Sequence, residues 1–209
     1  MADDLSTPQS GGPPQVTPNP AREALLAAAL DIIDREGSSA LTVRSVAKAA
    51  GCSTTGVYTW FGGKNGLVEQ IFVDSFRQFG AHLLAAKGVR STTGDRALRA
   101  LGHAYREWAL ANPTRYMVMF GKAVPDYEPS MEARTVGLTS FAQLTDVTAA
   151  HLRRVGSTLD PLDIAFHLWA GVHGYVSLEM AGVDLAANDR ERAARFEVGI
   201  HRLLRGCLP

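Results

Sequence analysis

The 209-residue sequence has little cysteine and no excess charge of either sign. Its two cysteines, Cys52 and Cys207, fit neither a disulfide framework nor a zinc site. Basic and acidic residues number 21 each, so the net charge is zero, and neither a polybasic arm nor an acidic tail dominates the chain. A local basic surface is compatible with this total, because the rest of the chain can balance it.

Membrane and export signals are also missing. No apolar run approaches the roughly 20 residues that span a bilayer. The first residues, Met1-Ala-Asp-Asp-Leu, lack the basic and apolar regions of a secretory signal. We therefore expect a cytoplasmic protein without a membrane partner.

Motifs of catalysis and metal binding are absent as well. The six histidines never show the His-Glu-x-x-His spacing of a helical zinc site, and no order of serine, histidine and aspartate suggests a nucleophile. Gly62-Gly63-Lys64 is similar to part of a phosphate-binding loop, but Asn65 stands where that motif requires serine or threonine. The sequence thus predicts no enzymatic activity, no metal and no cofactor.

Proline is concentrated at the start of the chain. Five of the ten prolines lie in residues 1–20, among glycine, serine, threonine and asparagine. Such a segment has too little apolar surface to offset the entropy lost on ordering. Residues 1–20 are therefore predicted to form a disordered tail.

Apolar residues recur at helical spacing through the rest of the chain. Leu25, Ala29 and Ile32 mark the first such stripe, and Gly37 ends it. No strand-like alternation is sustained anywhere, so the predicted class is all-α. The helices are expected at residues 21–36, 43–50, 54–61, 64–86, 95–111, 113–121, 130–155, 161–182 and 188–206.

Residues 42–61 have the proportions of two short helices joined by a tight turn at Gly51, with a supporting helix before them. That layout is the helix-turn-helix of DNA-binding proteins, whose second helix enters the major groove. The alternative is an ordinary three-helix packing unit with a solvated face.

Charge and hydroxyl content favour DNA. No acidic residue stands between Gly37 and Val68, whereas Arg44, Lys48 and Lys64 are basic. Hydroxyl groups suit phosphate oxygens, and threonine methyls can also contact thymine. The hydroxyl-bearing residues of this segment include Thr42, Ser45, Ser53, Thr54, Thr55, Tyr58 and Thr59.

Residues 41–67 read Leu41-Thr-Val-Arg-Ser-Val-Ala-Lys-Ala-Ala-Gly-Cys-Ser-Thr-Thr-Gly-Val-Tyr-Thr-Trp-Phe-Gly-Gly-Lys-Asn-Gly-Leu67. This stretch closely resembles the N-terminal domain of tetracycline-repressor-like (TetR/AcrR) regulators. The sequence departs from the family pattern at Cys52, Thr55 and Trp60, where valine, glycine and histidine are common. The residues in register with the family are Thr42, Val46-Ala47, Ala50-Gly51, Ser53, Val57-Tyr58, Phe61 and Lys64.

The resemblance implies a DNA-binding domain over residues 21–66 and a larger domain for effector binding and dimerisation over residues 67–209. It implies that Thr42, Arg44 and Lys64 hold phosphates, while the helix 54–61 faces the duplex. Trp60 is assigned either to packing or to DNA contact. The candidate DNA-binding residues are Thr42, Arg44, Ser53, Thr54, Thr55, Tyr58, Thr59 and Lys64.

The predicted helix 161–182 carries apolar side chains on two sides. A helix that is apolar on two sides must be buried on two sides, and one of them calls for a partner. Helices 161–182 and 188–206 of two subunits are therefore predicted to form a four-helix homodimer interface that includes Val176, with a larger monomeric bundle as the alternative. The two stripes are Phe166, Trp169, His173, Val176 and Met180, and Ile164, Leu168, Gly171, Tyr175 and Leu178.

The segment Leu168-Trp-Ala-Gly-Val-His-Gly-Tyr-Val-Ser-Leu-Glu-Met-Ala-Gly182 looks like the Trp-His-Gly type of C-terminal domain found in a subset of these regulators. The resemblance implies a pocket for a small molecule that it does not identify. The candidate walls of this pocket are Tyr105, Trp108, Tyr116, Met119, Phe120, Phe141, Trp169 and His173. The same residues would also make a plain core, and His173 would also fit as a hydrogen-bonded core histidine.

The leading functional prediction is a dimeric, ligand-responsive transcriptional regulator. It would act as a repressor that binds a palindromic operator in double-stranded DNA and is released by a small molecule. An all-helical small-molecule-binding protein or enzyme without DNA binding is the alternative. A third reading is an architectural helix-turn-helix protein without a ligand.

Overall fold

A computed structural model describes residues 19–89 and 94–209, with the backbone alone for residues 87–89. The described residues form α-helices and one short 3-10 turn and contain no strand, so the all-α prediction is confirmed. The elements are α1 Pro20–Glu36, η1 Ser38–Ala40, α2 Val43–Ala49, α3 Thr54–Phe61, α4 Lys64–Val89, α5 Asp95–Ala111, α6 Pro113–Phe120, α7 Met131–Arg154, α8 Pro161–Met180 and α9 Asp189–Cys207. The predicted tail, residues 1–20, lies outside the described residues except for its last two.

The start of α1 corrects the predicted boundary of that tail. The Asn19 carboxamide oxygen accepts hydrogen bonds from the backbone N–H groups of Ala21 and Arg22, at 3.0 and 3.2 Å. Pro20 occupies the first helical position, where its missing N–H costs nothing. Pro20 is therefore helical, although the proline-rich composition of residues 1–20 predicted that it belongs to the disordered tail.

The other helix ends lie within three residues of their predicted positions. α4 continues to Val89 rather than residue 86, and α8 ends at Met180 rather than residue 182. Gly182 follows α8 in the left-handed region, with φ +69°. The turn η1 was not predicted from the sequence.

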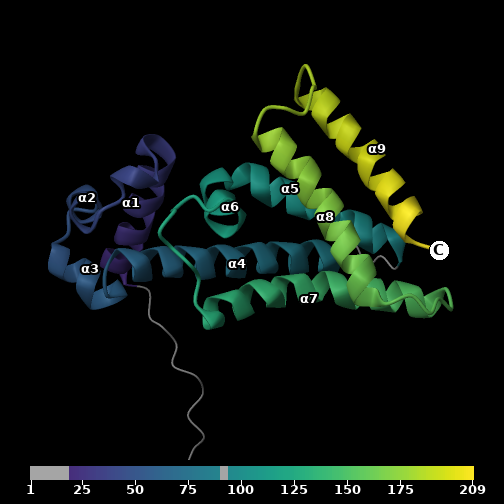
Figure 1. The fold of residues 1–209 in the computed structure, drawn as a ribbon, viewed down its shortest axis with the longest axis horizontal. Coiled ribbons are helices and arrows are strands. Elements are labelled where there is room, and N and C mark those ends of the chain that lie inside the picture. The colour runs from purple at the N-terminus through teal and green to yellow at the C-terminus, as the bar shows by residue number, and fades with distance from the viewer. Residues whose placement is uncertain (1–18, 90–93) are drawn as a thin grey trace, which may run out of the picture.

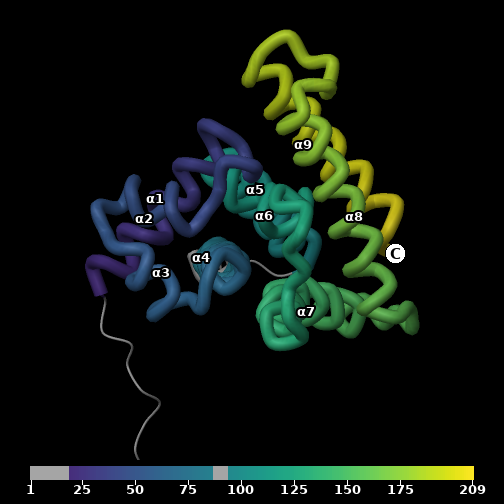
Figure 2. The backbone as a smooth tube through the Cα atoms, turned by 60° about the vertical axis from the view of Figure 1, so that its left-hand side comes forward, coloured from purple at the N-terminus to yellow at the C-terminus, as the bar shows by residue number. Residues whose placement is uncertain are grey.

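The 26-residue helix α4 is the central element of the molecule (Figure 1). Helices α1–α3 gather around its N-terminal end, and α7 runs alongside it. Helices α8 and α9 form a hairpin on the far side from α1–α3 (Figure 2). The fold thus separates a small N-terminal unit from a larger helical body and connects them through one long helix.

A continuous apolar core runs through both parts. Leu25, Leu41, Val46 and Val57 are fully buried in the N-terminal unit, and Leu67 continues the same core onto α4. Burying each large aliphatic side chain contributes about 1.5–3 kcal/mol, so α4 is firmly held at this end. Within the part of the chain that the structure describes, no helix is long and apolar enough to cross a bilayer.

Candidate nucleic-acid interface and internal cavities

Helix α2 begins with a reciprocal cap. The Thr42 hydroxyl accepts a hydrogen bond from the Ser45 backbone N–H at 3.0 Å, and the Ser45 hydroxyl accepts one from the Thr42 backbone N–H at 2.9 Å. Gly51 adopts φ +64° in the turn after α2, a conformation that side chains with a Cβ rarely adopt. The sequence therefore fixes both ends of α2 locally.

Helix α3 carries most of the predicted DNA-facing residues. Its first free N–H groups are capped by Ser53, whose hydroxyl accepts from the Gly56 backbone N–H at 3.2 Å. Val57 points into the core, whereas Thr54, Thr55, Tyr58 and Thr59 are exposed. The polar side of α3 is thus open along its whole length.

Three glycines set the angle between α3 and α4. Gly62 and Gly63 have φ values of +69° and +129°, which end α3 sharply. A Cβ atom at Gly66 would lie 1.8 Å from the Phe61 carbonyl oxygen, so only glycine fits at this position. This close approach holds the start of α4, including Lys64, directly against the end of α3.

The exposed surface of α2 and α3 is positive and rich in hydroxyl groups. Arg44 and Lys48 are exposed, Lys64 is half-buried, and none of the three forms an ion pair with the residues that the structure describes. The surface can therefore bind phosphate oxygens without first breaking internal salt bridges. Trp60 is 44% exposed on the same helix, so it is open to contact as well.

The eight candidate DNA-binding residues all lie on this unit, and the structure adds a second role for two of them. The Thr42 and Ser53 hydroxyls cap helices, so their side chains are already oriented by hydrogen bonds. Contacts of the eight residues with DNA stay predictions.

Polar contacts near the N-terminal unit join α1 and the first part of α4 to the larger body. The Thr114 hydroxyl of α6 donates to the Asp34 carboxylate of α1 at 2.6 Å. The Tyr127 hydroxyl donates to the Glu69 carboxylate of α4, which also accepts from the Ser130 backbone N–H at 3.4 Å. These hydrogen bonds hold the pKa of Glu69 below its usual range, against the opposing effect of burial. The larger body is therefore in direct polar contact with both α1 and α4.

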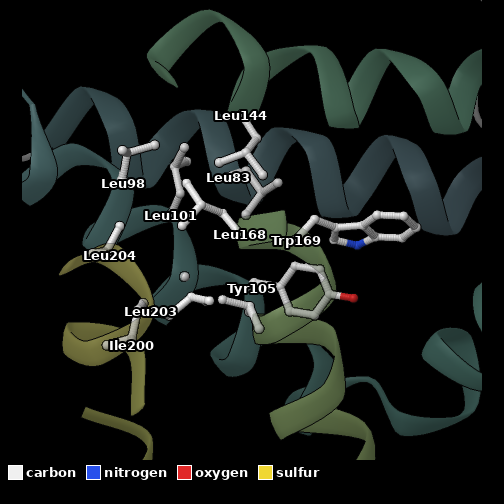
Figure 3. Close-up of a pocket in the computed structure, with 12 residues that line it drawn as sticks. Leu83, Leu98, Leu101, Tyr105, Leu144, Leu168, Trp169, Ile200, Leu203 and Leu204 are labelled. Carbon is white, nitrogen blue, oxygen red and sulfur yellow. The ribbon is translucent and has the colours of Figure 1, made fainter. Parts of the chain in front are cut away.

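An apolar cavity of about 50 Å³ lies between α4, α5, α7, α8 and α9 (Figure 3). Leucines from α5 and α9 lie at one end, and Tyr105 and Trp169 at the other. We call this space the apolar cavity. Its walls are Leu83, Leu98, Leu101, Gly102, Tyr105, Leu144, Leu168, Trp169, Val172, Ile200, Leu203 and Leu204.

Of the eight predicted pocket residues, Tyr105 and Trp169 line the apolar cavity. Met119 and Phe120 line a separate space of about 180 Å³ between α4, α6 and residues 122–134. The side chains of the other four pack around these spaces: Trp108 on Phe79, Phe141 on Trp169, and Tyr116 on His173.

A polar cluster lies beside the aromatic end of the apolar cavity. The Tyr105 and Tyr116 hydroxyls lie 2.8 and 2.7 Å from His173 Nδ1, and the Ser177 hydroxyl lies 3.3 Å from the Tyr116 hydroxyl. Burial lowers the pKa of His173 and raises the pKa of both phenols, so all three groups are held neutral. Ser177 was not among the predicted pocket residues, although it lies one helical turn from His173.

The hairpin of α8 and α9 leaves an apolar face exposed. Phe166 and Leu178 of α8 are 53% and 52% exposed, and Val198 of α9 is 49% exposed. Val176 is fully buried inside the subunit, so its placement in a dimer interface was wrong. Two residues of helix turn through about 200°, which leaves Val176 and Leu178 about 160° apart around the axis, on opposite faces.

A buried ion pair joins α5 to α8 beneath that face. The Arg106 guanidinium donates two hydrogen bonds to the Glu179 carboxylate, at 2.7 and 2.5 Å, and it also lies 5.4 Å from the Phe196 ring of α9. Both charged side chains are at most 15% exposed. The pair fixes the hairpin on the body, because removing either partner would leave a buried charge.

Comparison with known proteins covers both parts of the fold. Residues 25–71 match the family described as bacterial regulatory proteins, tetR family, and residues 98–203 match the tetracyclin repressor-like C-terminal domain. The HTH-type transcriptional regulator Rv1816 of Mycobacterium tuberculosis is 26% identical over 195 residues, which cover 78% of this chain and 83% of the relative. The uncharacterized HTH-type transcriptional regulator Rv0681 of the same species is 26% identical over 218 residues, covering 97% and 95%.

Solved structures share the fold over most of its length. SCO4313, crystallised as a candidate regulatory protein, superposes with a TM-score of 0.74 at 29% sequence identity. The superposition covers 88% of this chain and 95% of that one. The arrangement of a small N-terminal unit on a larger helical body is therefore shared with a solved relative.

Proposed function

The chain belongs to the tetR family of bacterial DNA-binding transcriptional regulators, and from that premise we propose that it is a homodimeric repressor released from its operator by a small molecule. The observation that carries this proposal is the combination of an acid-free helix-turn-helix with a separate helical body that contains an apolar cavity. One long helix, α4, belongs to both parts.

Binding to a palindrome is supported by the geometry expected of a symmetric dimer. A helix-turn-helix reads one half-site of the palindrome with its second helix, here α3. In a dimer, the two α3 helices would lie roughly 34–36 Å apart, which is one turn of the duplex, or at a related larger spacing. Thr54 and Thr55 stand in the first turn of α3, which enters the groove in this mode. Thr42, Arg44 and Lys64 flank it as phosphate contacts.

Dimerisation is supported by the exposed face of the α8–α9 hairpin. On α8, Phe166 and Leu178 flank the small residues Ala170 and Gly174, and on α9 Val198 is also exposed. A Cβ added at Gly174 would meet open space, so another helix can approach closely here. Two hairpins packed on this face would form an isologous four-helix interface.

Effector binding is supported by the apolar cavity and the polar cluster at its aromatic end. We assign Trp169, His173 and Gly174 to a C-terminal domain of the Trp-His-Gly type. Phe141 and His173 pack against Trp169, with ring centroids 5.7 and 5.8 Å from the Trp169 ring centroid. A ligand that displaced Trp169 would therefore also shift both of these side chains. No cofactor or metal takes part in this proposal. Chromosomal DNA lies in the bacterial cytoplasm, which places the proposed regulator there.

Selection of bound sequences from random double-stranded DNA tests this function. We expect one palindromic sequence to be enriched and its complex with the protein to be released by one class of small molecule. Binding without sequence preference would favour an architectural protein. Ligand binding without any DNA binding would favour a small-molecule-binding protein or an enzyme, and either result would contradict the proposal.

A further inference from the structure

Arg22 lies in the first turn of α1 and contacts the end of α3. Its guanidinium carbon lies 5.6 Å from the centroid of the Phe61 ring, so the cation sits over the face of the last residue of α3. Both side chains are half-buried. Arg22 is not among the predicted DNA-binding residues, and it precedes residues 25–71, which match the family of the N-terminal unit. Its role therefore has to be argued from its surroundings.

The ring contact holds the guanidinium of Arg22 without occupying its hydrogen-bond donors. A cation over an aromatic face is attracted by the π electrons of the ring, so the N–H groups around the edge of the guanidinium remain available. Within residues 19–89 and 94–209, the Arg22 side chain donates no hydrogen bond and forms no ion pair. Arginine has five such donors in a planar fork that matches the oxygen atoms of a phosphate.

The Phe61 ring places Arg22 at the junction of α3 and α4. Lys64, which the proposed function assigns to a phosphate, begins α4 three residues after Phe61. Figure 1 shows the start of α1 beside the end of α3 and the start of α4. The C-terminal end of α3 is therefore bordered by two cations, Arg22 from α1 and Lys64 from α4.

Few carboxylates oppose these two cations. Helix α3 has no charged residue, and the first carboxylate of α4 is Glu69, which accepts hydrogen bonds from the larger body. On α1, Glu23 is exposed but lies about 100° around the helix axis from Arg22. The next acidic residue of α1 is Asp31, nine residues or about 14 Å further along the helix. The charges at the junction therefore sum to a positive value in a chain of zero net charge.

We propose that Arg22 binds a phosphate of the DNA backbone beside the one bound by Lys64, and that the Phe61 ring positions its guanidinium for this contact. The contact extends the DNA-binding surface from α2, α3 and α4 onto α1. It reaches no base edge, so it contributes affinity and orientation rather than sequence preference. The inference rests on DNA binding by the helix-turn-helix, but not on the palindrome, the dimer or the effector.

Equilibrium binding of the full chain to duplex DNA at several salt concentrations tests the contact. The probe is the duplex selected from random DNA, or a duplex of random sequence where selection enriches no palindrome. Arg22→Gln should weaken binding about tenfold and lower the slope of log affinity against log salt by about 1 for each subunit bound. Arg22→Lys keeps the charge, so the slope should stay the same. Its affinity should fall about threefold, because an ammonium group does not donate as a planar fork.

Phe61→Leu separates the positioning of Arg22 from its charge. This variant removes the ring but keeps every cation, so affinity should fall about threefold with an unchanged salt slope. In the Phe61→Leu background, Arg22→Gln should cost less affinity than it costs in the wild type, because the guanidinium is no longer held in place. Additive losses of affinity would contradict the positioning role of Phe61.

Arg35→Gln is the matched control, because it removes an exposed arginine from the other end of α1, about 20 Å along the same helix. Its affinity and salt slope should equal those of the wild type, and the melting temperature of each variant shows whether it remains folded.

An unchanged slope in Arg22→Gln would overturn the inference, as would an equal loss of affinity in Arg35→Gln. Failure of the proposed function is distinguishable from failure of this contact. DNA binding without a palindrome would contradict the proposed function and leave the Arg22 contact standing. A wild-type protein that binds no DNA would contradict both.

Discussion

Lys64 is the clearest test of a contact with the DNA backbone, because it lies beside Gly62 and Gly63 at the start of α4. A lysine there can reach a phosphate but reads no base edge. We expect Lys64→Ala to weaken binding equally across operator variants and to lower the slope of log affinity against log salt by about 1. Arg202→Ala, an exposed cation on α9 at the far side of the molecule from α1–α3, is the control. An unchanged slope would remove Lys64 from the contact surface.

Thr42 and Thr54 differ in what their side chains already do. Thr42→Ala removes the cap of α2, so we expect the free energy of unfolding to fall by about 1 kcal/mol and base preference to stay the same. Thr54→Ala breaks no cap and should change base preference with little change in stability. Urea unfolding and selection from random DNA measure the two effects. A Thr42→Ala variant with altered base preference would contradict the assignment.

His173 makes stability depend on pH. Burial lowers its pKa in the folded state, so the unfolded chain binds more protons near and below its ordinary value of about 6.5. The free energy of unfolding should therefore fall as the pH decreases from 7 towards 5, in addition to any contribution from other groups. His173→Asn keeps an acceptor near Nδ1 but does not titrate, so it should show a weaker fall. Equal slopes in urea titrations of both proteins would argue against this role.

At the scale of elements, the exposed face of the α8–α9 hairpin is the feature to test. Leu178→Asp adds a charge at the proposed interface without disturbing a buried side chain. We expect the dimer to dissociate at least about 100-fold more readily, because an unpaired charge would be buried on association, and operator affinity should fall with it. Sedimentation velocity and DNA titration measure these changes.

The control for this variant is Leu138→Asp on α7, which alters a 65% exposed leucine away from the hairpin. It should remain a dimer and bind the operator normally. A wild-type protein that is already monomeric would contradict the interface, as would a dimeric Leu178→Asp variant.

Helix positions could be predicted from sequence because local chemistry determines them. Thr42, Ser53 and Asp160 cap the helices that follow them, and Gly62 ends α3 in a conformation that glycine adopts freely. The face of α8 that a subunit buries depends on what packs against it. Both stripes of α8 are apolar, so the sequence alone placed Val176 at the wrong surface.

The cavity walls could be predicted only in part, for a related reason. Tyr105 and Trp169 line the apolar cavity, while Trp108 packs on Phe79. All three are aromatic residues on amphipathic helices, and the sequence alone does not distinguish a cavity wall from a packed core residue. Leu83, Leu98, Leu144, Leu168 and Leu204 meet at the apolar cavity although they come from five helices. No local pattern of residues marks such a meeting point.

At the scale of the whole molecule, the apolar cavity and α3 are connected through α4. Leu83 of α4 lines the apolar cavity, and Lys64 begins the same helix next to α3. An effector that favours a spacing of the two α3 helices other than the one the operator requires weakens operator binding. By reciprocity, the effector must bind more weakly to the operator complex than to the free protein. We expect a coupling of about 1–3 kcal/mol in both directions. Titration of effector with and without operator DNA measures it, and equal affinities would rule out this route.

The acid-free helix-turn-helix also makes the molecule an electric dipole. Residues 38–68 carry three positive charges and no negative ones in a chain of zero net charge, so the remaining residues sum to a net charge of 0 − 3 = −3. Because the net charge is zero, the electric field of DNA exerts mainly a torque that orients the molecule, rather than a net attractive force. The negative balance lies in residues 1–37, which hold two basic and six acidic residues, whereas residues 69–209 hold 16 basic and 15 acidic ones. An approaching molecule is turned so that the exposed surface of α2 and α3 faces the DNA, and this torque acts within about 10 Å of the phosphates at physiological salt. A molecule that approaches the DNA with another surface first is therefore rotated toward the α3 surface before contact.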